Sequence, residues 1–172
     1  MKKINERQMK KFKDMVDVAS HKYGTFAAVK PNQETIKKMN DFLQDNDITK
    51  DVDGKDLHIT VAFSKAPIPQ AKGDEPAFPL SAKFKEWKVF DTQLGTTGKC
   101  LVAAVDSPAL SAHHKKLLLD YKGSYDFPEY IPHMTVSYSF KGDVPKATPD
   151  FNLIFDSYTF KGIEPKYIGK KK

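Results

Sequence analysis

Hydrophobic and polar residues alternate along a short stretch of this chain and predict a β-strand. Side chains of an extended strand point to opposite faces in turn, so every second residue shares a face. The stretch spans residues 57–63, and its apolar face carries Ile59 and Val61. His58 and Thr60 lie side by side on the opposite face. The pattern predicts a strand with one face in the core and a polar face available for chemistry.

The same pattern returns in the second half of the chain, at residues 133–138. Here Met134 and Val136 form the apolar face, and His133 and Thr135 form the polar face. Two His-x-Thr strands in one small chain suggest one site built from two halves.

The segments around the two motifs follow each other in the same order, which predicts an internal duplication. Each half is expected to contain a strand, a helix, the His-x-Thr strand and a further strand. In the first half these are residues 25–30, 32–44, 57–63 and 80–90; in the second they are 101–106, 107–121, 133–138 and 151–160. The interval from Val29 to His58 differs by one residue from that between Val105 and His133.

The helices are predicted from apolar residues that recur every three or four positions. A first helix is expected over residues 5–22. Asn32 and Ser107 are expected to cap the next two helices, with Pro108 in the first helical position. The apolar face of the last helix is predicted to carry Leu110, His114, Leu117, Leu118 and Tyr121, and to exclude His113.

We therefore predict one α+β domain over residues 1–172, with two pseudo-symmetric lobes of antiparallel sheet and the helices outside. The lobes are expected over residues 23–95 and 96–168, with a turn at 95–98 between them. A pseudo-twofold axis would bring the two polar strand faces together across a central groove.

Composition places the chain among single-domain proteins of the cytoplasm. Its 172 residues carry a net charge of +6, which favours a polyanionic partner. No apolar run approaches the roughly 20 residues that span a bilayer, and the N-terminus does not resemble a signal peptide. The only cysteine is Cys100, which fits a reducing compartment. No membrane contact and no protein partner are implied.

Two histidines that face one groove suit phosphodiester cleavage. One imidazole can take a proton from the attacking oxygen while the other gives a proton to the leaving oxygen. The threonine hydroxyls can donate hydrogen bonds to the non-bridging phosphate oxygens. The residues of a single His-x-Thr strand more often have only a packing role. Two such strands in equivalent positions of a repeat favour a catalytic pair. No Cys/His or carboxylate cluster has the spacing of metal ligands, so no metal or other cofactor is predicted.

With its two His-x-Thr motifs, the chain resembles the 2H phosphoesterase superfamily over residues 23–167. The run Tyr-Gly-Thr-Phe-Ala-Ala-Val-Lys at 23–30, followed by Leu-His-Ile-Thr at 57–60, is similar to the phage anti-CBASS phosphodiesterases. These degrade the cyclic di- and trinucleotide messengers of bacterial antiphage signalling. The resemblance implies the bilobal 2H fold, a cyclic oligonucleotide substrate, and a reaction without metal carried by His58, Thr60, His133 and Thr135.

The resemblance also implies residues that bind the bases. Tyr23 and Trp87 are expected to stack on adenine or guanine, and Glu164 is expected to accept a hydrogen bond from a base amino group. For each of the three, packing or simple exposure is the alternative.

Two other functions fit the same motifs. A 2H enzyme of RNA ends, a 2′,3′-cyclic phosphodiesterase or a ligase, would use the histidines equally well. A module that sequesters nucleotides without cleaving them is the alternative from another class.

Overall fold

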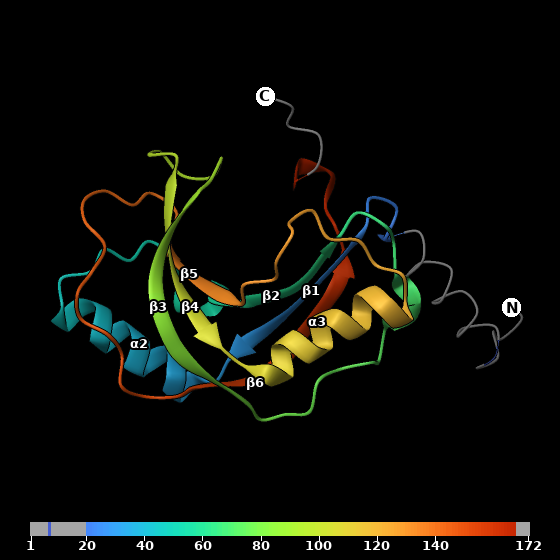
Figure 1. The fold of residues 1–172 in the computed structure, drawn as a ribbon, viewed down its shortest axis with the longest axis horizontal. Helices are drawn as coiled ribbons and strands as arrows, with labels where there is room; N and C mark the ends of the chain where they lie inside the picture. Colours follow the sequence, from blue (N-terminus) through green and yellow to red (C-terminus); the bar gives the residue numbers. More distant parts are fainter. Residues whose placement is uncertain (1–6, 8–19, 168–172) are drawn as a thin grey trace, which may run out of the picture.

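The computed structural model describes residue 7 and residues 20–167. The helix predicted over residues 5–22 falls almost entirely outside the described residues. Within them, six antiparallel strands and two α-helices confirm the α+β class. In Figure 1 the two helices flank the sheet at its left and right.

The six strands close into a ring in the order β1-β2-β5-β4-β3-β6. Their bounds are β1 Thr25–Pro31, β2 Ile59–Ser64, β3 Leu80–Asp91, β4 Lys99–Asp106, β5 His133–Ser137 and β6 Leu153–Gly162. The last strand was predicted to start and to end two residues earlier. It extends to Gly162 because that residue pairs with Thr25 of β1.

The ring joins the two halves of the sequence at four places, one of which is the pairing of β3 with β6 from Leu80 to Ala82. β1 pairs with β6 from Thr25 to Pro31, and β3 pairs with β4 through most of its length. β2 begins inside the first His-x-Thr motif, and β5 begins with the second. These two strands pair only at Ile59 and Met134. The strands of one half are therefore completed by strands of the other.

The helices begin where their capping residues predict. α2 spans Gln33–Asp45, and the Asn32 side chain accepts a hydrogen bond from the Thr35 N–H at 2.8 Å. α3 spans Pro108–Asp120, with the Ser107 hydroxyl as the corresponding acceptor. A side-chain oxygen at this position satisfies one of the free N–H groups of the first turn.

The buried face of α3 differs from the prediction at one residue. His113 was expected to lie off the apolar face, but its side chain is buried and its Nε2 lies 3.2 Å from the Tyr158 hydroxyl. His114, expected at the edge of the core, places Nδ1 at 2.7 Å from the Val61 carbonyl. Both rings are buried because each has a polar partner on the sheet.

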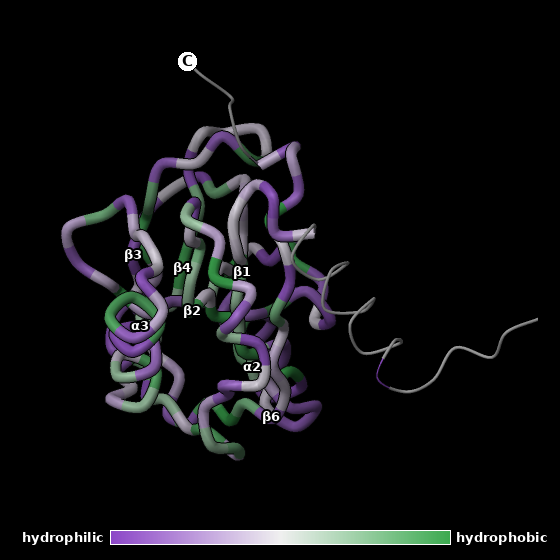
Figure 2. The backbone as a smooth tube through the Cα atoms, turned by 90° about the vertical axis from the view of Figure 1, so that its right-hand side faces the viewer, coloured by the Kyte–Doolittle hydropathy of each residue, from purple (hydrophilic) through white to green (hydrophobic). Residues whose placement is uncertain are grey.

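The core lies between the helices and the sheet. Figure 2 shows hydrophobic residues along β4, where Cys100 to Val105 are all buried. Met39 and Leu43 of α2 and Leu110 and Leu117 of α3 complete it, each at most 1% exposed.

Candidate functional site

The sheet brings the four His-x-Thr residues to one face. Ile59 lies opposite Met134, and both side chains are completely buried. The neighbouring side chains alternate to the other face. Continuing the antiparallel register places His58 across from Thr135, and Thr60 across from His133. Directly opposite residues have Cβ atoms about 4.5–5.5 Å apart, so the two motifs form one polar cluster.

Each imidazole is held by the same backbone contact. Nδ1 of His58 lies 2.8 Å from the Asp56 carbonyl, and Nδ1 of His133 lies 2.7 Å from the Ile131 carbonyl. A carbonyl oxygen can only accept, so this bond assigns the proton to Nδ1 in both rings. Nε2 of each ring is then available to take or give a proton.

An aromatic ring supports each histidine from the side. Phe26 meets His58 edge-on with centroids 5.9 Å apart, and Phe90 meets His133 at 5.2 Å in the same geometry. These contacts orient the imidazoles at little entropic cost, because the phenylalanines belong to strands β1 and β3.

The surroundings of His133 shift its pKa. Burial lowers the pKa of His133, and the nearby His58 lowers it further, while the Ile131 carbonyl acts in the opposite direction. Burial penalises the charged form of an imidazole, and a second imidazolium in the same cluster repels it. His133 is therefore neutral at neutral pH.

A cavity of about 500 Å³ opens on the His58 side of the cluster. Its wall is mainly apolar and aromatic, with Phe26, Phe63 and Ile163 among the lining residues. Two cations, Lys30 and Lys161, also line it. A concave apolar site with a few convergent polar groups is the usual form of a small-molecule site.

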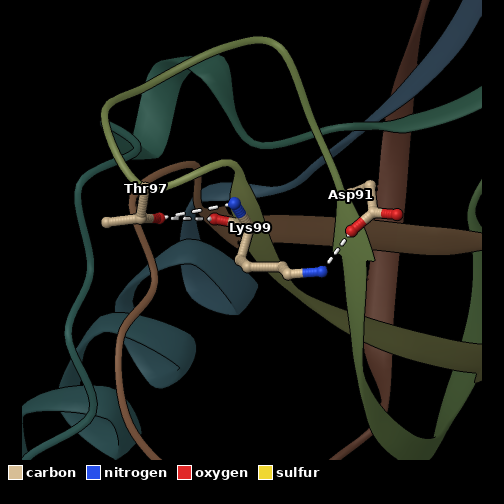
Figure 3. Close-up of polar contacts among 3 residues, drawn as sticks. All are labelled: Asp91, Thr97 and Lys99. Atoms are coloured by element: carbon tan, nitrogen blue, oxygen red, sulfur yellow. Dashed lines mark hydrogen bonds and ion pairs between the residues drawn. The ribbon is translucent and has the colours of Figure 1, made fainter.

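The hairpin between β3 and β4 contributes to the same cavity. Leu94 at its tip is one of the lining residues. The hairpin is closed by an ion pair between Lys99 and Asp91 and by hydrogen bonds between Thr97 and Lys99 (Figure 3). The backbone N–H of Thr96 also donates to the Ser139 hydroxyl at 2.9 Å, which ties the tip to the segment after β5.

Glu164 and Tyr23, two of the predicted base contacts, lie at or near this cavity. Glu164 lines it, and its carboxylate is 3.2 Å from the Lys166 ammonium. Tyr23 is 39% exposed, and it is not among the lining residues. Its neighbour Gly24 accepts a hydrogen bond from the N–H of Ile163, which places Tyr23 close to the rim.

Trp87, the third predicted base contact, packs in the core. Its side chain is only 7% exposed, and its indole N–H donates to the Ala147 carbonyl at 2.8 Å. Phe42 of α2 and Phe84 of β3 lie against the ring. The alternation on β3 turns Trp87 toward the helix, away from the groove, so we do not include it in the site.

Contacts of three residues near the site escaped the sequence-based reasoning. The Tyr130 hydroxyl donates to the Thr60 carbonyl at 2.7 Å, and His114 binds the next carbonyl, that of Val61. These rings stack with centroids 4.0 Å apart. Tyr138 lines the cavity, and its only signal in the sequence is its position, the fifth after His133.

Two negative findings concern the described residues alone. No group of three or more His, Cys, Asp or Glu side chains among them is arranged to hold a metal ion. None of the helices they form is long and apolar enough to cross a membrane.

The fold and the site define an α+β protein with two His-x-Thr strands that meet over a cavity. The chain belongs to the family described as Anti-CBASS protein Acb1, whose model matches residues 23–165 and so includes both motifs.

Three bacteriophage proteins with that name are similar to this chain. The protein of Acinetobacter phage Ac42 is 32% identical over 125 residues, which cover 72% of this chain and 79% of the relative. The protein of Enterobacteria phage T4 is 27% identical over 140 residues, with 76% and 85% covered. The protein of Vibrio phage KVP40 is 27% identical over 116 residues, with 67% and 72% covered.

Proposed function

We propose that this protein is a phosphodiesterase that cleaves cyclic di- and trinucleotide signals and thereby counters the bacterial antiphage defence CBASS. The relatives are named as anti-CBASS proteins of phages, which supports the biological role and an action in the cytoplasm of an infected bacterium. The observation that carries the chemistry is the crossed arrangement of the His58 and His133 motifs on one face, with both Nδ1 atoms bound and both Nε2 atoms available.

We assign the fold to the 2H phosphoesterase superfamily, with the two sequence halves, 23–95 and 96–168, as its pseudo-symmetric lobes. The strand order supports this assignment. Exchanging β1 with β4, β2 with β5 and β3 with β6 leaves the order around the ring unchanged.

The first step is an in-line attack of a ribose 2′-hydroxyl on the neighbouring phosphorus. His133 is the base in this proposal, since burial keeps its ring neutral and Nε2 can take the 2′ proton. The bond from phosphorus to the 5′ oxygen breaks, and His58 gives that oxygen a proton. The product is one linear chain with a 5′-hydroxyl at one end and a 2′,3′-cyclic phosphate at the other, which water then opens with the two roles reversed.

Charge that builds on the phosphate oxygens is stabilised by the hydroxyls of Thr60 and Thr135. Lys30 adds a cation, because the β1–β2 register pairs Val29 with Ile59 and so places Lys30 across from His58. Imidazoles carry both proton transfers, so this route requires no metal or other cofactor.

We propose that one nucleoside of the ring occupies the cavity beside His58. Its wall of aromatic and apolar side chains suits a base, and the Glu164 carboxylate can accept hydrogen bonds from a base amino group. Tyr23 remains a proposed stacking contact at the rim. The base contacts act in binding, so truncating them is expected to raise KM more than it lowers kcat.

The test is direct incubation of the protein with cyclic dinucleotides, cyclic trinucleotides, 2′,3′-cyclic mononucleotides and linear RNA, each in EDTA. We expect cleavage of the cyclic oligonucleotides to linear products with a terminal phosphate. His58→Ala and His133→Ala are each expected to lower kcat by about two to four orders of magnitude, the usual contribution of one acid–base group.

Each alternative outcome identifies a different function. Cleavage confined to 2′,3′-cyclic or long RNA substrates would indicate an enzyme of RNA ends. Tight binding with recovery of intact ligand would indicate a sequestering module. Full turnover by either alanine variant would refute the assignment of the histidines.

A further inference from the structure

An extra residue interrupts the strand pairing just after the threonine of each His-x-Thr motif. Thr60 and Ala62 of β2 pair with two successive residues of β1, so that Val61 between them is the extra residue. In β5 the same shift makes Val136, which follows Thr135, the extra residue. Such a β-bulge bends the strand and changes the direction of the side chains around it.

The two bulges shape the wall of the cavity. In the first motif Val61 and the residue after it are both buried, and Phe63 then lines the same cavity as His58. In the second motif Val136 and the residue after it are both buried, and Tyr138 lines the cavity. Strict alternation would have turned both rings toward the core. Each bulge therefore fixes an aromatic side chain of the wall relative to the motif.

The first bulge is held by two side chains from the other half of the chain. The Tyr130 hydroxyl donates to the Thr60 carbonyl at 2.7 Å, and Nδ1 of His114 lies 2.7 Å from the Val61 carbonyl. A carbonyl oxygen can only accept, so both side chains are donors. The two rings stack with an angle of 9° between their planes, so each supports the other.

The second bulge is held from the first half in the same way. The Val136 carbonyl accepts a hydrogen bond from the backbone N–H of Asp51, which lies between α2 and β2. The Asp51 carboxylate in turn accepts from the Ser137 hydroxyl and from the Tyr138 N–H, each at 2.8 Å. Each bulge is thus held by the half that carries the other motif. The two contacts on the first bulge come from side chains, so substitutions can remove them one at a time.

We propose that Tyr130 and His114 are positioning residues that hold the first bulge and act through Thr60. Fixing the Thr60 and Val61 carbonyls fixes the backbone from which the Thr60 hydroxyl donates to a non-bridging oxygen of the reacting phosphate. A donor held in advance costs no reorganisation when charge develops in the transition state. The inference rests on the proposed phosphodiesterase function and extends it to two residues outside both motifs.

The first test is a double-mutant cycle between Tyr130 and Thr60, measured as kcat and KM on a cleaved cyclic dinucleotide. Tyr130→Phe removes a single oxygen atom, and we expect it to lower kcat about tenfold with a smaller change in KM. In a Thr60→Val background the same change is expected to have less than about a twofold effect, because the hydroxyl that it positions is gone.

The control for this cycle is Tyr121→Phe, which removes a hydroxyl bonded at 2.6 Å to Asp74, outside the motif strands. It is expected to leave kcat unchanged. An equal loss of kcat from Tyr130→Phe with and without the Thr60 hydroxyl would overturn the inference. So would unchanged kcat in the single variant, or a rise in KM alone.

The two neighbouring histidines of α3 provide a second matched pair. Both are buried, but Nε2 of His113 lies 3.2 Å from the Tyr158 hydroxyl of β6 and not at a motif strand. His114→Leu and His113→Leu are both expected to lower the melting temperature, and only His114→Leu is expected to lower kcat, about tenfold. His114→Asn, whose amide nitrogen can replace Nδ1, is expected to keep kcat within about threefold. Equal losses of kcat from the two leucine variants would overturn the inference. Should His114→Leu fail to fold, the Tyr130→Phe cycle decides.

Nuclear magnetic resonance separates this inference from the proposed function, because it requires no turnover. Three-bond couplings of a threonine methyl group report the χ1 rotamer of the side chain. We expect a single rotamer at Thr60 in the unchanged protein and averaging between rotamers in Tyr130→Phe, with Thr135 unaffected as the internal control. This result in a protein that cleaves no cyclic oligonucleotide would refute the proposed function and still support the positioning of Thr60. A single, unchanged Thr60 rotamer in a Tyr130→Phe variant of an active enzyme would overturn the inference alone.

Discussion

Two histidines in similar local sequences are held by the same kinds of contact. Each donates from Nδ1 to the carbonyl two residues before it, which is a local contact, and each meets a phenylalanine edge. Burial lowers the pKa of His133, so that this ring is neutral at neutral pH. In the reaction that we propose, this neutral ring is the base.

Burial of three histidines predicts how stability depends on pH. It is the main cause that lowers the pKa of His113, His114 and His133 below the ordinary value of 6.5. Below that value the unfolded chain binds more protons than the folded one. The free energy of unfolding is therefore highest, as far as these histidines determine it, at pH 7.5, and it falls as the pH drops toward 5. Melting temperatures measured across this range check the sign.

A single variant tests the origin of this slope. His133→Asn removes one of the titrating groups, and we expect its melting temperature to fall less steeply between pH 7 and 5 than that of the unchanged protein. Stability that rises on acidification in this range would contradict the assignment of buried neutral imidazoles.

At the scale of the element, the β3–β4 hairpin connects the sheet to the site. Its tip packs on the segment after β5 through the Thr96 N–H and the close approach of Gly95 to Tyr138. The same tip carries Leu94 into the cavity wall. The hairpin thus acts as a wall for the site in addition to completing the ring.

Two glycines of this hairpin allow a matched prediction. Gly95 and Gly98 have φ values of +73° and +74°, so alanine at either is strained by about 1–2 kcal/mol. At Gly98 an added Cβ meets no atom within 4 Å, whereas at Gly95 it meets the Tyr138 carbonyl. We expect Gly95→Ala to lower the free energy of unfolding by clearly more than Gly98→Ala in urea titrations. Equal losses would show that the tip can move away from Tyr138.

At the scale of the whole molecule, the closed ring makes the two halves interdependent. β1 depends on β6 for one of its edges, and β3 depends on β4, so strands of both halves lie in every part of the sheet. The site shares this property, because the first motif runs from His58 into β2 and the second lies in β5.

This closure predicts a single cooperative unfolding transition. Trp87 is the only tryptophan, and its buried position makes its fluorescence a probe of tertiary structure. We expect its transition in urea to coincide with that of the far-ultraviolet circular dichroism, as for a two-state domain. Two separate transitions would instead indicate lobes that unfold independently.

Local patterns in the sequence were enough for the class of fold, the helix caps at Asn32 and Ser107, and the strands of the two His-x-Thr motifs. These features depend on contacts within a few residues: alternation along a strand, the recurrence of apolar residues on a helix, and a side chain that caps the next turn. The convergence of His58 and His133 followed from the repeat, because similar segments adopt similar folds.

Placement of several other residues was decided only by long-range packing. The alternation of residues along β3 does not tell which of its two faces lies in the core. Trp87 points inward because of the pairing of β3 with β4 and the contact of its ring with Phe42. His113 is buried because Tyr158, far along the chain, offers its hydroxyl. Tyr138 lines the cavity, and Asp51 and Gly95 contact its backbone from two distant loops. Such contacts join residues tens of positions apart, and no local period records them.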